Sequence, residues 1–274
     1  EKAGKSVGVL ALDERRKATV QGKPQWGEGK VGGAFQFNRN SHIDLGDIAN
    51  FERTDSFSFG AWVKPAGKAN GAFLARMDDS NSYRGFDVMG NGEGVAVHII
   101  NNWPSNAIKV NTVKGLKPDE WQHVFVTYDG SSKAAGISIY FDGQKQEWTI
   151  EQYRLTETIR TDKPLHLGRR SPGSPFNGWI DEARVYSRQL SELEVKSLSG
   201  ADPLAPILAK DPSLWTPEER QALLTHYLNQ FDAPYQQLAK EVSRLKTEVA
   251  DARKPITTVM VMEDGKSPRM TYVL

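Results

Sequence analysis

Up to about Ser199, the chain consists of short segments in which apolar and polar residues alternate, separated by Gly, Asn and Asp. Alternation with a period of two places every second side chain on one face of a β-strand. The pattern therefore predicts an antiparallel β-sandwich rather than alternating strands and helices. The segments that show it are 33–37, 56–63, 86–89, 95–100, 121–129, 137–141, 165–167 and 179–186. This number of strands is enough for two packed sheets.

The apolar positions of these segments define the expected core. In the segment 56–63, for example, Phe57, Phe59 and Ala61 share one face. After the segment 137–141, the pair Asp142-Gly143 suits a tight hairpin because such turns need positive φ. We expect the following residues to be mostly buried: Phe37, Phe57, Phe59, Trp62, Val124, Val126, Ile139 and Phe141.

The composition changes after residue 200. The segment 201–206 contains Pro203 and Pro206, which cannot continue a helix or a central strand, so we predict that it is stiff and extended, within a proline-containing linker over 201–215. Thr216-Pro217-Glu218-Glu219 then has the N-cap hydroxyl, the proline and the glutamate that open a helix. This helix is expected to end at Asp232-Ala233-Pro234, and one side of it carries Leu223, Leu224, Tyr227, Leu228 and Phe231.

A second predicted helix follows and ends at Pro255. Its apolar residues step by three and four, as in a heptad repeat: Tyr235, Leu238, Val242, Leu245, Val249 and Ala252. The charged residues that flank this seam are Lys240, Glu241, Arg244 and Glu248. Because the break between the helices is short, we expect the segment 216–254 to form an antiparallel hairpin that packs its own seam and leans on a further surface.

The segment 255–274 is strand-like and stops at the apolar run Tyr272-Val273-Leu274 without a terminating signal. We therefore expect an extended tail that is the start of a further domain, in a chain cut out of a longer protein. The predicted fold class is an all-β sandwich, followed by a C-terminal α-helical hairpin and this strand-like tail.

Composition and charge narrow the classes of partner. The 274 residues include 35 basic and 34 acidic side chains, so a net charge of +1 provides no bulk field that would draw the chain to nucleic acid or to an anionic bilayer. The sequence contains no run of about 20 apolar residues, so it predicts no membrane span. The absence of cysteine excludes disulfides, thiolate metal sites and thiol nucleophiles.

Several strings carry a family resemblance. Val31-Gly32-Gly33-Ala34-Phe35-Gln36-Phe37, His42-Ile43-Asp44-Leu45-Gly46 and the segment 57–65 resemble the opening strands of a laminin G-like, concanavalin A-like jelly roll. The segments 121–124, 127–130, 140–143, 167–168 and 178–186 are similar to that family's later strands, in the family's order. The resemblance covers about residues 6–199 and implies a jelly-roll sandwich over residues 1–200.

A narrower resemblance is carried by the segments 98–110, 133–136 and 258–263, together with Pro268-Arg269. They resemble the laminin G-like insert and the following helix hairpin of large planctomycete surface proteins that also carry a cytochrome c domain. The resemblance implies that both ends of the chain are internal boundaries. It also implies an extracytoplasmic location, in the periplasm or at the cell surface, and a binding or scaffolding role. Because a haem motif needs cysteine, no haem-binding residue carries over to this chain.

Related sandwiches include glucanases, so catalysis has to be tested on the residues. A retaining glucanase needs two carboxylates about 5 Å apart, as alternating acidic residues on one strand provide, and the sequence contains no such run. Adjacent pairs such as Asp181-Glu182 point to opposite faces of a strand. The five histidines lack metal-site spacing, and no Gly-x-Ser-x-Gly elbow occurs. We therefore expect a protein that is not an enzyme.

Calcium is the metal that the resemblance favours, because related sandwiches often hold a structural ion where the first and last strands meet. Asp181 occupies the matching position, and Asp13 with Glu14, at the end of the N-terminal strand, are the expected neighbours. The alternative is that Asp181 caps a turn or forms an ion pair with Arg184 or an N-terminal lysine.

A candidate ligand site lies in the segment 101–106, where Trp103 is flanked by Asn101, Asn102 and Asn106. This mixture suits sugars, whose C–H faces stack on aromatic rings while their hydroxyls bond to amides. Tyr83 and Arg84, in the polar loop 78–84, are expected to line the same cleft. The alternative is that Trp103 plugs the end of the sandwich. Arg169-Arg170 forms a basic loop that suits the binding of anionic glycans. The alternative is that this loop is a solvated turn.

Two hypotheses about function remain. The first is a non-catalytic, extracytoplasmic carbohydrate-binding or adhesion module of a larger protein. The second is a structural spacer that packs against neighbouring domains of the parent protein and binds no small ligand. A groove with Trp103 lying face-up favours the first hypothesis. Exposed apolar surface on the helices, at Tyr227, Phe231 or Tyr235, favours the second.

Overall fold

The computed structural model describes residues 7–10, 13–23 and 25–253. The chain divides into two compact units, Glu1–Leu223 and Leu224–Leu274, and each is described by itself. The tail predicted over 255–274, and Pro255 as the end of the second helix, lie outside the described residues.

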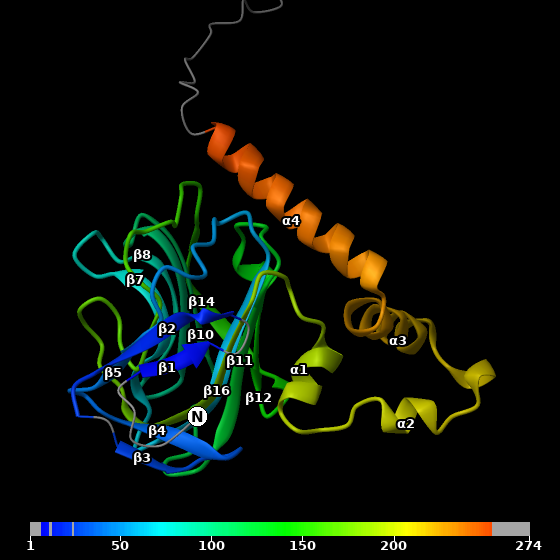
Figure 1. Ribbon diagram of the computed structural model, residues 1–274, viewed down its shortest axis with the longest axis horizontal. Coiled ribbons are helices and arrows are strands. Elements are labelled where there is room, and N and C mark those ends of the chain that lie inside the picture. Colours follow the sequence, from blue (N-terminus) through cyan, green and yellow to red (C-terminus); the bar gives the residue numbers. More distant parts are fainter. Residues whose placement is uncertain (1–6, 11–12, 24, 254–274) are drawn as a thin grey trace, which may run out of the picture. The chain divides into compact units, whose positions relative to one another are not determined.

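The described part of the first unit contains two β-sheets that face each other (Figure 1). One has nine strands, in the order β1-β2-β5-β15-β7-β8-β9-β10-β14: Val7–Leu10 (β1), Asp13–Gln21 (β2), His42–Asp44 (β5), Asn70–Asp78 (β7), Arg84–Asn91 (β8), Val95–Asn102 (β9), Asn106–Thr112 (β10), Trp148–Arg154 (β14) and His166–Leu167 (β15). The other has seven, in the order β13-β12-β11-β6-β16-β4-β3: Gln25–Glu28 (β3), Gly33–Asn38 (β4), Phe57–Pro65 (β6), Gln122–Tyr128 (β11), Ile137–Phe141 (β12), Gln144–Lys145 (β13) and Asn177–Tyr186 (β16). The paired strands are antiparallel, which confirms the predicted class.

The core lies between the two sheets. All eight residues predicted to be buried are buried, and most of them belong to one hydrophobic cluster that both sheets contribute to. Trp62 is the exception, because it lies on the far side of its sheet, where it packs against His123 and the Lys30 ammonium lies over its ring. The alternation of strand residues therefore predicted burial correctly, and it also places Trp62 on the face opposite to Ala61 and Val63, which lie in the core.

A short helix after β16 covers the outer side of the seven-stranded sheet. Helix α1 (Glu192–Leu198) begins at Ser191, whose hydroxyl accepts from the Glu194 backbone N–H while the Glu194 carboxylate accepts from the Ser191 N–H. This capping box directs Val195 toward Phe125 and Tyr140 of the sheet. Helix α1 was not among the elements expected from the sequence.

The predicted linker, 201–215, is partly helical, and its helical part begins within the segment 201–206 that was expected to be extended. It contains the short helix α2 (Ala205–Leu208) and the 3₁₀ turn η2 (Pro212–Leu214). A separate 3₁₀ turn, η1 (Ala134–Gly136), lies just before β12 in the sandwich. The prediction of an extended segment was wrong because Pro206 lies in the first turn of α2. A proline in that position loses no helical hydrogen bond. Trp215 then donates from its indole to the Ile207 carbonyl and closes the segment.

The two predicted C-terminal helices are present as α3 (Pro217–Gln230) and α4 (Ala233–Arg253). The break falls where it was expected, because the Asp232 carboxylate accepts from the Tyr235 backbone N–H at the start of α4. The prediction that the helices pack their own seam was wrong for most of it, although Leu223 and Leu228 are half-buried. Along the described seam the side chains are exposed: Leu224, Tyr227, Phe231, Tyr235, Leu238, Val242, Leu245 and Val249.

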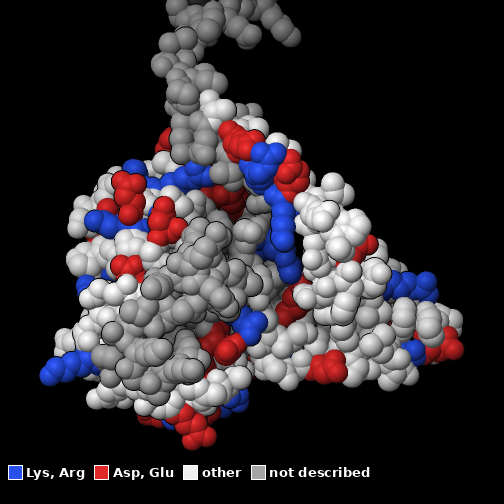
Figure 2. Space-filling model, in the orientation of Figure 1, with Lys and Arg blue, Asp and Glu red and all other residues white. Residues whose placement is uncertain are grey.

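None of the helices in the described part of the chain combines the length and the apolar character that a membrane span requires. Acidic and basic side chains are interspersed on the face seen in Figure 2, in keeping with the net charge of +1.

Candidate functional site

A row of polar residues crosses the outer face of the nine-stranded sheet, the face turned away from the core. On β8, Phe86 and Val88 point into the core, so Asp87 points to the outer face. Asp87 lies directly opposite His98 of β9, and His98 lies opposite Lys109 of β10. Antiparallel register therefore aligns three polar side chains across three neighbouring strands.

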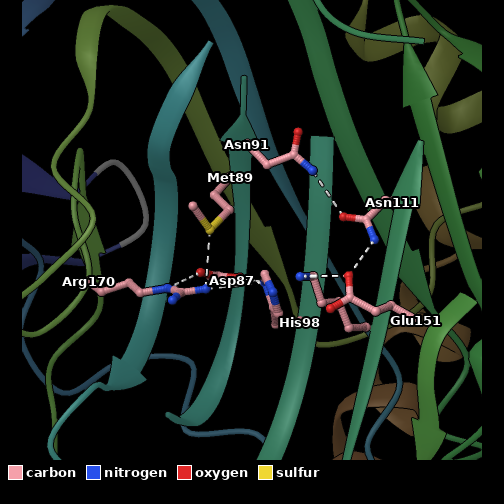
Figure 3. Close-up of polar contacts among 8 residues, drawn as sticks. Asp87, Met89, Asn91, His98, Asn111, Glu151 and Arg170 are labelled. Carbon is pink, nitrogen blue, oxygen red and sulfur yellow. Dashed lines mark hydrogen bonds and ion pairs between the residues drawn. The ribbon is translucent and has the colours of Figure 1, made fainter. Parts of the chain in front are cut away.

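Asp87 is the centre of a buried ion pair (Figure 3). Its Oδ1 lies 2.7 Å from His98 Nδ1, and its Oδ2 accepts from Arg170 Nε at 2.5 Å. Arg170 comes from the loop after β15, and its Nη2 also contacts the Met89 sulfur at 3.2 Å. We assign a hydrogen to His98 Nδ1, because the ionised carboxylate at 2.7 Å only accepts hydrogen bonds; Arg170 Nη2 lies further from the same nitrogen, at 3.2 Å. All three ionisable side chains are buried.

The charges within this cluster compensate one another. Burial alone would raise the pKa of Asp87, but the Arg170 guanidinium and the hydrogen-bonded His98 outweigh it and lower this pKa to about 2. Burial would lower the pKa of Arg170, and the Asp87 carboxylate reverses this and raises it. Asp87 is therefore ionised at neutral pH, and Arg170 is its counter-charge.

The row continues into solvent on the side of β10 and β14. The Lys109 ammonium lies 2.7 Å from Glu151 Oε2, which also accepts from the Asn111 amide at 3.1 Å. Asn111 Oδ1 in turn accepts from the Asn91 amide at 3.1 Å. Hydrogen bonds from Lys109 and Asn111 outweigh partial burial and lower the pKa of Glu151. We call the whole set the polar row: Arg170, Asp87, His98, Lys109, Glu151, Asn111 and Asn91.

Trp103 borders the polar row. Its indole is half-buried against a small apolar cluster on the same outer face, which includes Ile100 and Ala107. The His98 ring meets it edge-on, with 6.2 Å between centroids, and the Lys109 ammonium lies 5.3 Å from its centroid. The indole is therefore neither as open as a face-up sugar platform requires nor, as in the alternative, a plug at the end of the sandwich, because it packs on the outer face of one sheet.

The structure brings the other predicted ligand residues together only in part. Tyr83 is 39% exposed, and its ring lies 5.6 Å from the Arg170 guanidinium. Its loop is joined to that of Trp103, because the Trp103 backbone N–H donates to the Ser82 carbonyl. Asn102 is exposed in the same hairpin. Arg84 donates from Nε to the Asn101 carbonyl at 3.3 Å.

Asn101 and Asn106 do not take part in the predicted cleft. The Asn101 amide is buried and donates to the Thr158 carbonyl at 2.6 Å. Asn106 donates to the Thr156 hydroxyl and accepts from the Thr156 backbone N–H. Both amides therefore hold the segment 156–158 at the sheet edge, and the prediction that they flank the indole with free amides was wrong.

The carboxyl groups of this face do not form a glycosidase pair. Such an enzyme needs one carboxyl with a raised pKa as the acid and a second, free carboxylate. Burial raises the pKa of Asp79, in the loop 78–84, but both oxygens of the nearby Asp87 are engaged by Arg170 and His98. This arrangement fits the orientation of polar groups for binding better than acid–base chemistry.

A serine and a histidine also meet beside this face. Ser171 Oγ lies 3.1 Å from His166 Nδ1, and His166 Nε2 lies 3.8 Å from Asp44, beyond hydrogen-bond distance. Burial lowers the pKa of His166, although Asp44 opposes this. The set therefore lacks the oriented base of a Ser-His-Asp triad.

Asp181 occupies a different place, in the seven-stranded sheet. Its Oδ2 accepts from the Val31 backbone N–H and its Oδ1 from the Glu182 N–H, both at 2.8 Å. This geometry matches the alternative in which Asp181 caps a turn. Across the described ranges, His, Asp and Glu form no group of three or more that could hold a metal ion. The calcium site stays a prediction.

The other two calcium candidates lie at the start of β2 rather than at the end of the N-terminal strand. Asp13 pairs with Leu10 in the nine-stranded sheet, whereas Asp181 lies on β16 of the other sheet. The side chains of Asp13 and Glu14 lie outside the described residues.

An antiparallel two-sheet sandwich of this kind defines the jelly-roll class of domains. Residues 37–196 match the family Laminin_G_3, described as the concanavalin A-like lectin/glucanases superfamily, and the chain belongs to this family. The resemblance to planctomycete surface proteins stays a prediction.

Solved structures share this fold. The chain is similar to the binding domain of Paraclostridial Mosquitocidal Protein 1, with a TM-score of 0.52 and 17% identity over 71% of this chain and 51% of that chain. It is also similar to botulinum neurotoxin type C, whose cell entry is dependent upon interaction with two ganglioside molecules. The TM-score is 0.50 and the identity is 14%, over 68% of this chain and 46% of that chain. A third similar structure is Domain 4 of AbnA, a GH43 extracellular arabinanase from Geobacillus stearothermophilus, in complex with arabinotriose. Its TM-score is 0.47 and its identity is 20%, over 66% of this chain and 87% of that chain. The chain thus spans about half the length of the two toxin chains.

Proposed function

We propose that this chain is a non-catalytic carbohydrate-binding or adhesion module of a larger extracytoplasmic protein, and that it binds its glycan beside Trp103. The observation that carries the proposal is the position of Trp103, a half-exposed indole at the border of the polar row. Family membership supports it, because the family is named for lectins as well as glucanases.

The side chains around Trp103 have the chemistry that sugars need. A sugar presents an apolar C–H face, which stacks on an aromatic ring, and hydroxyls that both donate and accept. Lys109 beside the ring is a donor and its partner Glu151 is an acceptor, so a ligand next to the indole can reach polar groups of both kinds.

The similar toxin structure supports the same class of ligand. Botulinum neurotoxin type C interacts with ganglioside molecules, and this chain shares its fold. We expect low affinity, because one stacked ring contributes on the order of 1 kcal/mol and exposed polar groups also bind water well.

The experiment is a glycan array and a thermal melt on the same set of proteins, with and without calcium. Trp103→Ala removes the ring, and Trp103→Leu removes the aromatic face but keeps apolar packing against Ile100 and Ala107. Tyr153→Ala is the matched control, because Tyr153 is a 75% exposed aromatic residue that lies opposite the inward-facing Ile108.

We expect wild type and Tyr153→Ala to bind the same glycans and both Trp103 variants to lose binding. Because Trp103 is half-buried, Trp103→Ala should also cost stability, at about 1–3 kcal/mol, below the 3–5 kcal/mol of a fully buried tryptophan. A blank array for the wild type, or unchanged binding by folded Trp103→Leu, overturns the proposal.

The structural spacer is the second candidate function, and a specific observation favours it. Tyr227, Phe231 and Tyr235 are all exposed within the described part of the chain. A spacer predicts that the chain recovers other domains of its parent protein in a pull-down and that the array is blank.

A further inference from the structure

Helix α4 carries an exposed apolar stripe, which we call the α4 seam. Tyr235, Leu238, Val242, Leu245 and Val249 lie on it, and each is between 41% and 66% exposed. The steps of three and four residues keep these side chains on one face along a 21-residue helix. A contiguous apolar surface of this kind marks an interaction site.

The residue types on the seam favour one kind of partner. In heptad notation, the a positions are Tyr235, Val242 and Val249, and the d positions are Leu238, Leu245 and Ala252. A β-branched residue at a, combined with leucine at d, favours a parallel coiled coil of two strands. The central heptad, residues 242–248, has this combination in full, with Val242 at a and Leu245 at d.

The charges beside the seam are complementary to a second copy of the same helix. The g positions of two successive heptads are Glu241 and Glu248, and the sequence has Lys246 and Arg253 at the e positions that follow them. In a parallel dimer, each g residue faces the following e residue of the other copy, so both pairs join opposite charges. In an antiparallel dimer, g faces g, and glutamate would lie beside glutamate.

The ion pairs that exist along α4 are compatible with this arrangement. Arg244 contacts both Glu241 and Glu248, one turn away on either side. These pairs are exposed, so each contributes little to stability. A carboxylate accepts at several positions, and each glutamate can therefore contact Arg244 and a basic residue of the second copy together.

We infer that α4 pairs with α4 of a second copy of this chain in a parallel two-stranded coiled coil. In a parallel pair, both copies enter the coiled coil from the same end. Dimerisation itself does not depend on the glycan. Its consequence does rest on the proposed function: two weak sites on one dimer would bind a multivalent glycan surface with increased avidity.

Sedimentation velocity of the full chain tests the dimer. Because three heptads make a short coiled coil, we expect a monomer–dimer equilibrium that shifts toward twice the chain mass of 30.5 kDa as the concentration rises from about 1 to about 200 µM. The double variant Lys246→Glu with Arg253→Glu makes e and g both acidic and should be monomeric, while Arg244 keeps its contacts. Lys240→Glu, on the opposite side of the helix at position f, is the matched control and should dimerise like wild type.

A charge exchange then tests the pairing rule. Glu241→Lys with Glu248→Lys makes e and g both basic and should also be monomeric alone. Mixed with the acidic variant in equal amounts, it should form a heterodimer. Circular dichroism of each variant verifies that the sandwich is folded, so that a monomer is not mistaken for an unfolded chain.

Orientation is tested by cross-linking, which is simple because the chain contains no cysteine. Ala252→Cys, at a d position, should form a disulfide-linked dimer in a parallel pair, since the two copies of position 252 are then neighbours. An antiparallel pair would place them at opposite ends.

A chain that stays monomeric at every concentration, or a dimer that does not cross-link at position 252, overturns the proposal. A monomer that binds a neighbouring domain through Leu238 and Leu245 would assign the seam to the spacer function instead. Because no glycan is present in these experiments, their failure is distinct from a blank array.

Discussion

Replacing Asp87 by asparagine tests how the polar row is held together. Asp87 is fully buried and is bound to Arg170 Nε at 2.5 Å and to His98 Nδ1 at 2.7 Å. Asparagine keeps the shape and an oxygen for His98, but removes the carboxylate that is hydrogen-bonded to the buried Arg170 guanidinium and leaves only the weaker, longer-range charge of Asp79. Breaking a buried pair in this way costs about 3–5 kcal/mol, a large part of the 5–15 kcal/mol that stabilises a typical domain.

A double-mutant cycle separates the ion pair from local packing. Arg170→Met alone removes the cation, and the pair Asp87→Asn with Arg170→Met removes both charges from the same place. We expect the double variant to be more stable than Asp87→Asn alone, with a coupling of about 1–3 kcal/mol, because no unpaired charge remains. Urea denaturation followed by tryptophan fluorescence measures each free energy of unfolding. A loss below about 1 kcal/mol for Asp87→Asn, or strictly additive single variants, would refute this reasoning.

The same pair predicts a loss of stability in acid. The pKa of Asp87 is lowered from 3.8 to about 2 in the folded protein, so its contribution is present above pH 3.8 and is lost as the pH falls through 2. A shift of this size corresponds to about 2–3 kcal/mol. Asp87→Asn should lack this part of the pH dependence, and an unchanged acid limb in that variant would contradict the assignment.

Three further predictions concern other parts of the chain. Burial, with Arg184 nearby, lowers the pKa of His123 to about 4, so the unfolded chain takes up the proton first and stability falls by up to about 3 kcal/mol as the pH drops from 6.5 to 4. His123→Phe keeps the stack on Phe125 and should reduce this slope in pH-dependent denaturation; an equal slope contradicts it. Gly85→Ala should cost at least about 2 kcal/mol, because φ is +131° and a Cβ would lie 1.9 Å from the Arg76 carbonyl oxygen. Gly46→Ala, at φ +75° with open space around it, should cost only about 1 kcal/mol. Thermal melts of both glycine variants measure this, and equal losses of stability in the two would argue against the close contact at Gly85. The calcium prediction requires that EDTA lower the melting temperature of wild type but not of Asp181→Ala, and an EDTA-indifferent curve rules it out.

The features that the sequence predicted are local ones. Phe57 and Phe59 alternate with polar or small residues within one strand, so their burial follows from the strand period alone. The break at Asp232 also follows from neighbouring residues, since its carboxylate caps the helix that begins at the next residue. Such signals need no knowledge of which strands are neighbours.

The polar row depends on non-local information that the sequence does not contain. Alternation places Asp87 and His98 on the polar faces of their own strands, but only the register of β8 with β9 puts them opposite each other. Arg170 reaches Asp87 from 83 residues further along the chain, through a loop with no strand pattern. The heptad pattern of α4 is a similar case, because it marks an apolar face without identifying what packs against it.

The buried pair and the proposed glycan site are connected through His98, and this connection separates scaffolding from recognition. The His98 ring is bound to Asp87 on one side and meets Trp103 edge-on at 6.2 Å on the other. Asp87→Asn keeps an acceptor for His98, so we expect the variant to lose stability while Trp103 keeps its position. Well below its melting temperature, its glycan affinity should then stay within about twofold of wild type, a difference of less than 0.5 kcal/mol. Trp103→Leu should show the opposite pattern, with a large loss of affinity and a smaller loss of stability. If folded Asp87→Asn fails to bind the glycan, the buried pair belongs to the recognition site itself, and the ligand extends along the polar row toward Arg170.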